Sequence, residues 1–240
     1  MNIAIIGYGK MGHAIERFAR QRGHQIVAII DHDNIHDFDS EGFLSADVAI
    51  EFTSPASAVD NYRRCFDRGI KVVSGSTGWR DHATEVERMC RQAEGTFLWS
   101  SNYSVGVNIF FALNTYLASV MSHFPQYTPS IKEIHHIHKL DHPSGTAITL
   151  ATEVIAHSPT LDSWSESQVD HALLIEHERE GEVPGTHIVT WDSPVDTITI
   201  EHRAKSRDGF ALGAVMAAEW AATRQGVLSL DDMYRDLIAR

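Results

Sequence analysis

A glycine-rich turn between two apolar runs near the start of the chain limits the possible folds of this sequence more than any other segment. Residues 2–6 read as a buried strand, and residues 25–30 read as a second one that ends at Asp31. Between them lies a helical pattern that stops at Gly23. The turn that begins this helix consists of Gly7, Tyr8, Gly9, Lys10, Met11 and Gly12. This order predicts a βαβ unit with a G-x-G-x-x-G turn that binds a dinucleotide.

Each part of the turn has a physical role in such binding. The glycines let the backbone approach a pyrophosphate at the helix N-terminus, where N–H groups and the helix dipole favour an anion. Asp31 can accept hydrogen bonds from a ribose diol and repels a 2′-phosphate, so we expect NADH to be favoured, with NADPH possible. The alternative is a tight strand–helix turn that binds nothing.

The pattern then continues as further α/β units. Strands are expected at residues 47–52, 70–74 and 96–99, with helices at 55–68 and 81–93. Small polar loops follow two of these strands, where a doubly wound sheet places its cofactor crevice. We expect these loops to flank the nicotinamide, although ordinary turn chemistry is the alternative. Their residues are Gly75, Ser76 and Thr77, and then Ser100, Ser101, Asn102 and Tyr103.

The second half of the chain has a different pattern. After a long apolar helix at 105–124, strand-like runs are expected as antiparallel neighbours at 131–137, 171–178, 185–192 and 196–203. Residues 157–169 are polar and predict a loop, whereas the helical segments at 211–223 and from Ser229 onward should pack on the first half.

The predicted fold class is therefore α/β, a Rossmann-type doubly wound parallel sheet plus a second α+β domain for substrate binding and oligomerisation, with a mixed or antiparallel sheet. We assign residues 1–104 and 208–240 to the dinucleotide-binding domain and residues 105–207 to the second domain.

The stretch richest in reactive side chains is 133–147, which holds four histidines, one lysine and two carboxylates. Residues 131–137 alternate like a strand, and a helix should begin near Ala147, with Ser144 or Thr146 as its cap. Such a helix start offers free N–H groups to a carboxylate or phosphate. Lys139 can serve as a proton donor or an anion anchor.

Metal binding is the alternative for this stretch. His136 and His138 would share one face of the predicted strand and can chelate zinc. Neither cysteines nor an H-E-x-x-H spacing accompany them, so we expect no metal. Taken singly, each histidine and the Ser-Gly-Thr turn can also be structural.

Composition excludes several classes of partner. The net charge is −12, from 20 basic and 32 acidic side chains, which argues against nucleic acid and anionic membranes. An anionic substrate would need a local cationic pocket, either the 133–147 stretch or the segment 203–207. Cys65 and Cys90 lie in separate helical patterns, and no signal peptide or long apolar run is present, so we expect a cytoplasmic protein.

Together these motifs resemble the 4-hydroxy-tetrahydrodipicolinate reductase family, also called dihydrodipicolinate reductase, of lysine and diaminopimelate biosynthesis. The most specific is Glu133-x-His-His-x-x-Lys139-x-Asp-x-Pro-Ser-Gly-Thr-Ala147. The resemblance covers nearly the whole chain. Further matches are Gly7-x-Gly-x-Met-Gly12, Glu51-Phe-Thr, Gly75-Ser-Thr-Gly78, Asn102-Tyr-Ser-Val-Gly-Val-Asn108, Val183-Pro-Gly-Thr186 and His202-x-Ala-x-Ser-Arg207-x-x-Phe210-Ala-x-Gly213.

The resemblance implies hydride transfer from NADH or NADPH to a cyclic unsaturated dicarboxylate, by a homotetramer built through the second domain. It implies that His135 and Lys139 form the acid/base pair and that His136 contacts the substrate. It also implies that Ser144, Gly145 and Thr146 bind a carboxylate. The cofactor contacts would be Gly7 to Gly12, Asp31, Gly75 to Thr77 and Ser100 to Tyr103.

Two other functions remain open at this point. One is a different two-domain NAD-dependent oxidoreductase that acts on aspartate or a semialdehyde, and the other is a non-catalytic NADH sensor. The distance between His135 and Lys139 is also open, because four residues of extended strand would separate them by roughly 13 Å. Either the chain bends after His136, or the two residues act at different points of the substrate.

Overall fold

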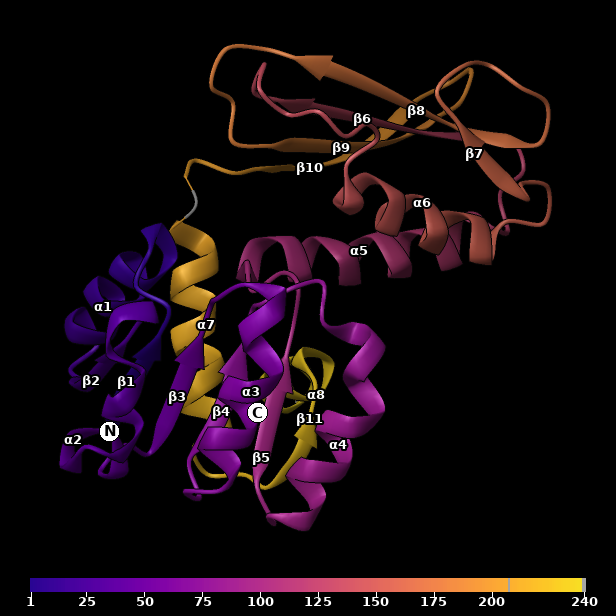
Figure 1. Ribbon diagram of the computed structural model, residues 1–240. Coiled ribbons are helices and arrows are strands. Elements are labelled where there is room, and N and C mark those ends of the chain that lie inside the picture. Colours follow the sequence, from indigo (N-terminus) through magenta and orange to yellow (C-terminus); the bar gives the residue numbers. More distant parts are fainter. Residues whose placement is uncertain (207, 239–240) are drawn as a thin grey trace. The chain divides into compact units, whose positions relative to one another are not determined.

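The structure, a computed structural model, describes residues 1–206 and 208–238. They form two compact units, 1–104 with 208–238 and 105–206, which are described separately here. Figure 1 follows the chain through both units. Arg207, the last residue of the predicted cationic segment 203–207, lies outside the described residues, as do residues 239–240. Within the described residues no helix combines the length and apolarity needed to cross a membrane.

The first unit is built on a parallel sheet, sheet A, with six strands in the described residues. Their spatial order is β11-β5-β4-β3-β1-β2, and every pair is parallel. The strands are β1 (Asn2–Ile6), β2 (Gln25–Ile30), β3 (Val48–Glu51), β4 (Lys71–Ser74), β5 (Thr96–Trp99) and β11 (Gly226–Leu228). The predicted parallel sheet is confirmed, but β11 was not expected, because three residues carry no readable pattern.

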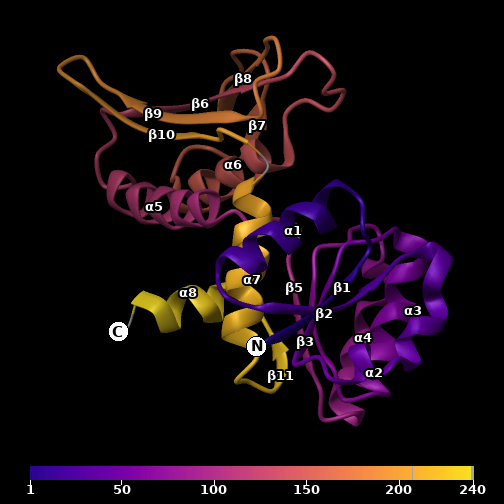
Figure 2. The ribbon, with the colours of Figure 1, turned by 90° about the vertical axis from the view of Figure 1, so that its left-hand side faces the viewer.

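Helices cover both faces of sheet A, as Figure 2 shows, with α1 and α7 on one face and α3 and α4 on the other. Because side chains alternate along a strand, Ile3 and Ile5 pack toward α1 and α7, and Ala4 and Ile6 pack toward α3. The helical elements are α1 (Lys10–Gln21), the 3-10 segment η1 (His32–Asp39), α2 (Glu41–Leu44), α3 (Pro55–Phe66), η2 (Arg80–His82), α4 (Ala83–Gln92), α7 (Asp208–Ala221) and α8 (Leu230–Ile238).

The second unit is a mixed sheet, sheet B, with two helices on one face (Figure 1). In the described residues its strand order is β10-β9-β6-β8-β7. Ile131, Ile175 and Val189 of the sheet pack against Leu150 and Val154 of the second helix. The elements are α5 (Val105–Met121), β6 (Thr128–His135), α6 (Gly145–His157), β7 (Ser163–Ser165), β8 (Ala172–Arg179), β9 (Thr186–Asp192) and β10 (Thr197–Arg203).

Two predictions for this unit were wrong. β6 and β8 pair in parallel, not antiparallel, because α6 carries the chain back along the sheet before β8 begins. The polar segment 157–169 is not a loop throughout, since it contains β7, which pairs with β8. A three-residue edge strand with serines at both ends has too little apolar alternation to be seen in the sequence.

Gly213 of α7 brings that helix into contact with the backbone at the carboxyl end of β5. A Cβ atom at this position would lie 1.7 Å from the carbonyl oxygen of Tyr103. The buried Tyr103 hydroxyl in turn donates hydrogen bonds to the carbonyl oxygens of Ser74 (2.7 Å) and Leu98 (3.2 Å). The glycine therefore sets the position of a loop at the edge where the nucleotide is expected.

We expect Gly213→Ala to lower the free energy of unfolding by about 1–3 kcal/mol, the usual cost of overpacking, measured by urea denaturation. Helix propensity alone predicts the opposite sign, a gain of about 1 kcal/mol. Gly209→Ala on the same helix is the control, because its Cβ would meet only Ser104 Oγ at an ordinary 3.5 Å. An unfolding free energy at or above that of the native chain for Gly213→Ala would show that the close approach carries no cost.

Candidate active site

The loops at the carboxyl ends of sheet A lie together, as parallel strands require. One cavity of about 370 Å³ is lined by residues that include Gly7, Tyr8, Gly9, Asp31 and Thr53. A second, of about 330 Å³, adds the predicted cofactor residues Lys10, Met11, Gly75, Ser76 and Thr77. The structure thus places most of the predicted dinucleotide contacts around two cavities in the first unit.

The glycine turn has the geometry that a pyrophosphate needs. Gly7 has a φ of +89°, and a Cβ there would lie 2.1 Å from the carbonyl oxygen of Phe52. Gly9 begins α1 without any side-chain cap, and a Cβ there would meet nothing within 4 Å. Gly9 therefore offers the first N–H groups of α1 no side-chain cap and leaves an open space beside them, which fits an anionic group of a nucleotide. Gly12 is buried, and its Cβ would lie 2.4 Å from the Gly7 carbonyl oxygen.

Asp31 is an ionised carboxylate that borders the first cavity. It accepts hydrogen bonds from the backbone N–H of His32 (2.9 Å) and of Tyr8 (3.2 Å), and Asn34 completes a capping box with it. The hydrogen bond from His32 lowers the Asp31 pKa most, even though partial burial acts in the opposite direction. Because 44% of the side chain remains exposed, it can still meet a ribose.

Glu51 organises the same edge, although the sequence analysis gave it no role. Its fully buried carboxylate accepts hydrogen bonds from Ser74 Oγ (2.6 Å), from Ser76 Oγ (2.9 Å) and from both the N–H (3.1 Å) and the hydroxyl of Thr53. One side chain therefore fixes the loops that follow β3 and β4. The Glu51-Phe-Thr motif was the available signal.

Two residues of the loop after β5, Ser100 and Asn102, are hydrogen-bonded to each other. Ser100 Oγ donates to the carbonyl oxygen of Asn102 and accepts from its N–H, both at 3.0 Å. Ser101 is exposed, whereas the Tyr103 side chain points into the core. The nicotinamide contacts of this loop stay a prediction.

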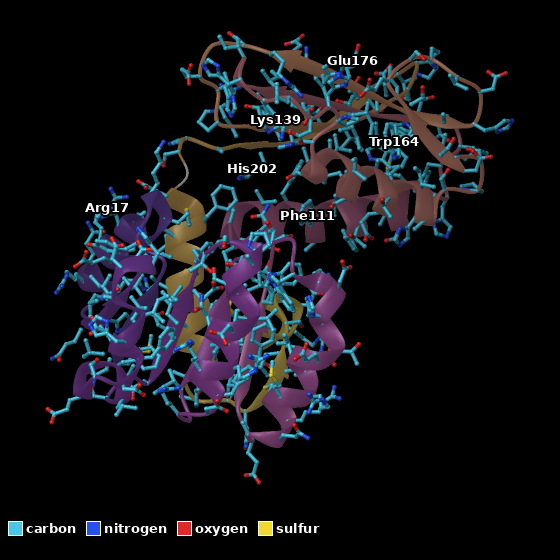
Figure 3. All side chains as sticks on the ribbon, viewed as in Figure 1. Arg17, Phe111, Lys139, Trp164, Glu176 and His202 are labelled. Atoms are coloured by element: carbon cyan, nitrogen blue, oxygen red, sulfur yellow. The ribbon has the colours of Figure 1, made fainter. Side chains whose placement is uncertain are left out.

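In the second unit, β6 ends at His135, so His136 and His138 do not share a strand face, and that expectation was wrong. Their rings lie 6.1 Å apart in the loop 136–144. The chain does bend after His136, because the N–H of Lys139 donates to the His136 carbonyl at 3.1 Å. The Lys139 ammonium then contacts both carboxylate oxygens of Asp141, at 2.7 and 2.8 Å. Lys139 is labelled in Figure 3.

The centre of this unit's polar cluster is Glu133, whose carboxylate is fully buried. It accepts hydrogen bonds from the N–H of Ser144 (3.1 Å) and from Arg179 (3.2 Å), and His135 Nδ1 lies 3.3 Å away. Burial alone would raise the Glu133 pKa, but the contacts with His135 and Ser144 outweigh it and leave the pKa at about 2. Glu133 is therefore a carboxylate that ties β6 to β8 and to the start of α6.

His187 is a further member of the cluster, and the sequence analysis missed it. It pairs with Glu133 across β9 and β6, and its Nε2 lies 3.0 Å from Ser144 Oγ. Burial, and to a smaller extent the neighbouring His135, lower the His187 pKa to about 3, so the ring is neutral at pH 7. Alternation with buried Val189 and Trp191 was the signal that its side chain faces inward.

The sequence analysis predicted that the start of α6 binds an anion, and its geometry leaves room for one. Ser144 is the N-cap, and its hydroxyl accepts a hydrogen bond from the N–H of Ala147 at 3.2 Å. Of the first three N–H groups, helix geometry leaves those of Gly145 and Thr146 without an acceptor inside the helix. A Cβ at Gly145 would meet nothing within 4 Å, so a carboxylate has room to approach.

Comparisons with known proteins agree with this arrangement. Residues 1–103 match the model for the N-terminus of dihydrodipicolinate reductase, and residues 106–234 match that for its C-terminus. The chain belongs to the dihydrodipicolinate reductase family. Such enzymes are pyridine-nucleotide-dependent oxidoreductases with a nucleotide-binding N-terminal domain.

Individual relatives cover the whole chain. The chain is 45% identical to 4-hydroxy-tetrahydrodipicolinate reductase of Christiangramia forsetii, over 99% of both chains. It is 32% identical to the enzyme of that name from Archaeoglobus fulgidus, over 97% of this chain and 99% of the other. Its fold is similar to that of dipicolinate-bound dihydrodipicolinate reductase from Paenisporosarcina sp. TG-14, with a TM-score of 0.76 and 20% identity over 95% and 97% of the two chains.

In this reductase, neutral His187 makes folding sensitive to mild acid. Its folded pKa of about 3 lies below the ordinary 6.5, so the unfolded chain binds the proton more readily, and stability falls as pH falls below 6.5. Between neutral pH and about pH 5, protonation of His187 in the unfolded chain should lower the free energy of unfolding by about 2 kcal/mol. We expect His187→Gln to remove that loss, as measured by urea unfolding across this range. Exposed His123→Gln, which should keep the native pH dependence, is the control, and an unchanged slope in His187→Gln would contradict the assignment.

Proposed function

We propose that this chain reduces 4-hydroxy-tetrahydrodipicolinate to tetrahydrodipicolinate with NADH or NADPH, in lysine and diaminopimelate biosynthesis. The observation that carries this proposal is the grouping at the carboxyl end of β6. There His135, the Lys139 loop and the N-terminus of α6 meet around Glu133. A substrate with two carboxylates and a ring nitrogen needs cationic donors, free N–H groups and a proton source, and this edge offers all three.

One substrate carboxylate would bind at the start of α6, on the N–H groups of Gly145 and Thr146. The Ser144 hydroxyl already contacts Ala147 and His187, so its part is to shape the turn. The second carboxylate would lie against the histidines, with His136 as a direct contact.

Residues 7–12, Asp31 and the loops at 75–77 and 100–103 would hold the nucleotide, which would supply the hydride when bound. Reduction moves electron density toward the ring nitrogen of the substrate, and water is lost from the hydroxylated carbon. Lys139 and His135 are the proton donors of this edge, and Asp141 holds the Lys139 ammonium in place.

Lys139→Ala should lower kcat at least about a hundredfold, the lower range for a positioned acid, while the Kd for NADH stays within about twofold. The assay follows NADH absorbance with the freshly made condensation product of pyruvate and aspartate semialdehyde. Lys132→Ala is the matched control, because Lys132 lies on β6 and pairs with Glu178 (2.6 Å). Native turnover by Lys139→Ala would remove the lysine from the mechanism.

Asp31 should set the cofactor preference toward NADH. Removing its charge next to a 2′-phosphate is worth about 1.4 kcal/mol, so Asp31→Asn should raise the NADPH/NADH ratio of kcat/KM about tenfold. Asp33→Asn, two residues on and largely exposed, should leave that ratio unchanged. A ratio unaltered in Asp31→Asn would assign the preference to another residue.

The same substrate assay separates the alternatives. A reductase acting on aspartate or a semialdehyde would leave the condensation product unreduced, and an NADH sensor would bind NADH and oxidise none. We further propose that the chain acts in the cytoplasm as a homotetramer assembled through the second unit, which sedimentation velocity tests. No nucleic acid or membrane partner is proposed.

A further inference from the structure

Outside the grouping around Glu133, the second unit brings two histidines and a carboxylate together. They are His142 in the loop 136–144, Glu166 directly after β7, and His177 on β8. His142 Nδ1 lies 2.8 Å from Glu166 Oε1, and His177 Nδ1 lies 4.0 Å from the same oxygen. The two rings stack 4.3 Å apart at 17°. We propose that these three side chains form a binding site for a divalent transition-metal ion of the zinc class, which the residue spacing within 133–147 did not predict.

The donor set fits such an ion. Zinc prefers ligands such as imidazole and carboxylate, at about 2.0–2.2 Å from the metal. Two imidazoles and one carboxylate would leave the fourth position of a tetrahedral site open. Tetrahedral bonds of that length hold ligand atoms about 3.3 Å apart. The ligand atoms here all lie within 4.8 Å of one another. Because the three side chains are 32–49% exposed, they are free to close the remaining gap by rotation.

A second group, made of Glu133, His135 and His187, also has suitable spacing but opposes a metal. Arg179 already contacts the Glu133 carboxylate, and Ser144 Oγ lies beside His187 Nε2. A metal ion bound there would be repelled by the positive charge of Arg179, and its own charge would be buried at a cost in free energy. In contrast, among the described residues Glu166 forms ion pairs only with His142 and His177. No described lysine or arginine competes with a metal ion for its carboxylate.

The position of the site suggests what a bound ion does. His142 lies two residues before Ser144, the N-cap of α6, and His177 pairs in register with Glu133. The loop 136–144 carries Lys139 and leads into the cap at Ser144. An ion held by all three ligands would link this loop to β8 and to the end of β7. The bound ion would therefore stabilise the loop, and it would take no part in hydride transfer.

The test uses the full chain without a polyhistidine tag, stripped with a chelator and free of NADH and substrate, so it does not depend on the proposed reaction. Titration with ZnCl₂ should show one ion per chain. His142→Ala and His177→Ala should each weaken binding at least about tenfold, since each removes a ligand. Co²⁺ should give the absorption of a tetrahedral site, and Zn²⁺ should slow amide exchange over residues 136–144 and 163–168.

Two variants are matched controls. His123→Ala removes an exposed histidine of the same unit, and Glu176→Gln removes a carboxylate next to His177 on the opposite face of β8, labelled in Figure 3. Both should bind Zn²⁺ as the native chain does, as should His187→Gln. The proposal is overturned if the native chain binds no Zn²⁺ or if His142→Ala and His177→Ala bind it undiminished. Loss of binding in His187→Gln alone would overturn it too, because the ion would then lie in the buried group.

Discussion

The second unit depends on one buried carboxylate. Glu133 contacts Arg179 of β8 and the N–H of Ser144, with His135 beside it and His187 opposite it on β9. A buried charge without partners would cost several kcal/mol, so this residue forces three strands and a helix start into one arrangement. The N-terminus of α6, where a substrate carboxylate is proposed to bind, is consequently held by the buried Glu133 side chain.

The first unit also contains a buried carboxylate, but it is stabilised by different groups. Glu51 is equally buried, but its described hydrogen-bond partners are the hydroxyl groups of Thr53, Ser74 and Ser76 and the N–H of Thr53. Hydroxyl groups can turn to meet a neighbour, whereas the guanidinium of Arg179 is a fixed, charged fork. Each unit thus uses an inward-facing glutamate near the carboxyl end of a strand to fix the loops beyond it. Neither residue was given a role in the predicted chemistry.

Much of the molecule could be predicted because its signals are local. The apolar run at 2–6, the glycine turn and Asp31 specify a βαβ unit within about thirty residues. The Pro-Ser-Gly-Thr turn predicted a cap at Ser144 or Thr146, and the structure shows that it is Ser144. The short strands β7 and β11 could not be predicted, because each is stabilised by pairing with another strand, at Leu173 for β7 and at Leu98 for β11. Each of these strands has only three residues, too few to show the alternation of apolar and polar side chains that predicts a strand.

The family, the glycine turn and the polar stretch 133–147 could be recognised in the sequence, because each consists of contiguous residues. The parallel pairing of β6 with β8 and the contact of Lys139 with Asp141 are visible only in the folded chain. The same holds for the grouping of His187 and Arg179 with Glu133, and of His142 with Glu166 and His177. The reason is that strand register and loop closure bring together side chains from separate segments, and no local spacing records which ones will meet.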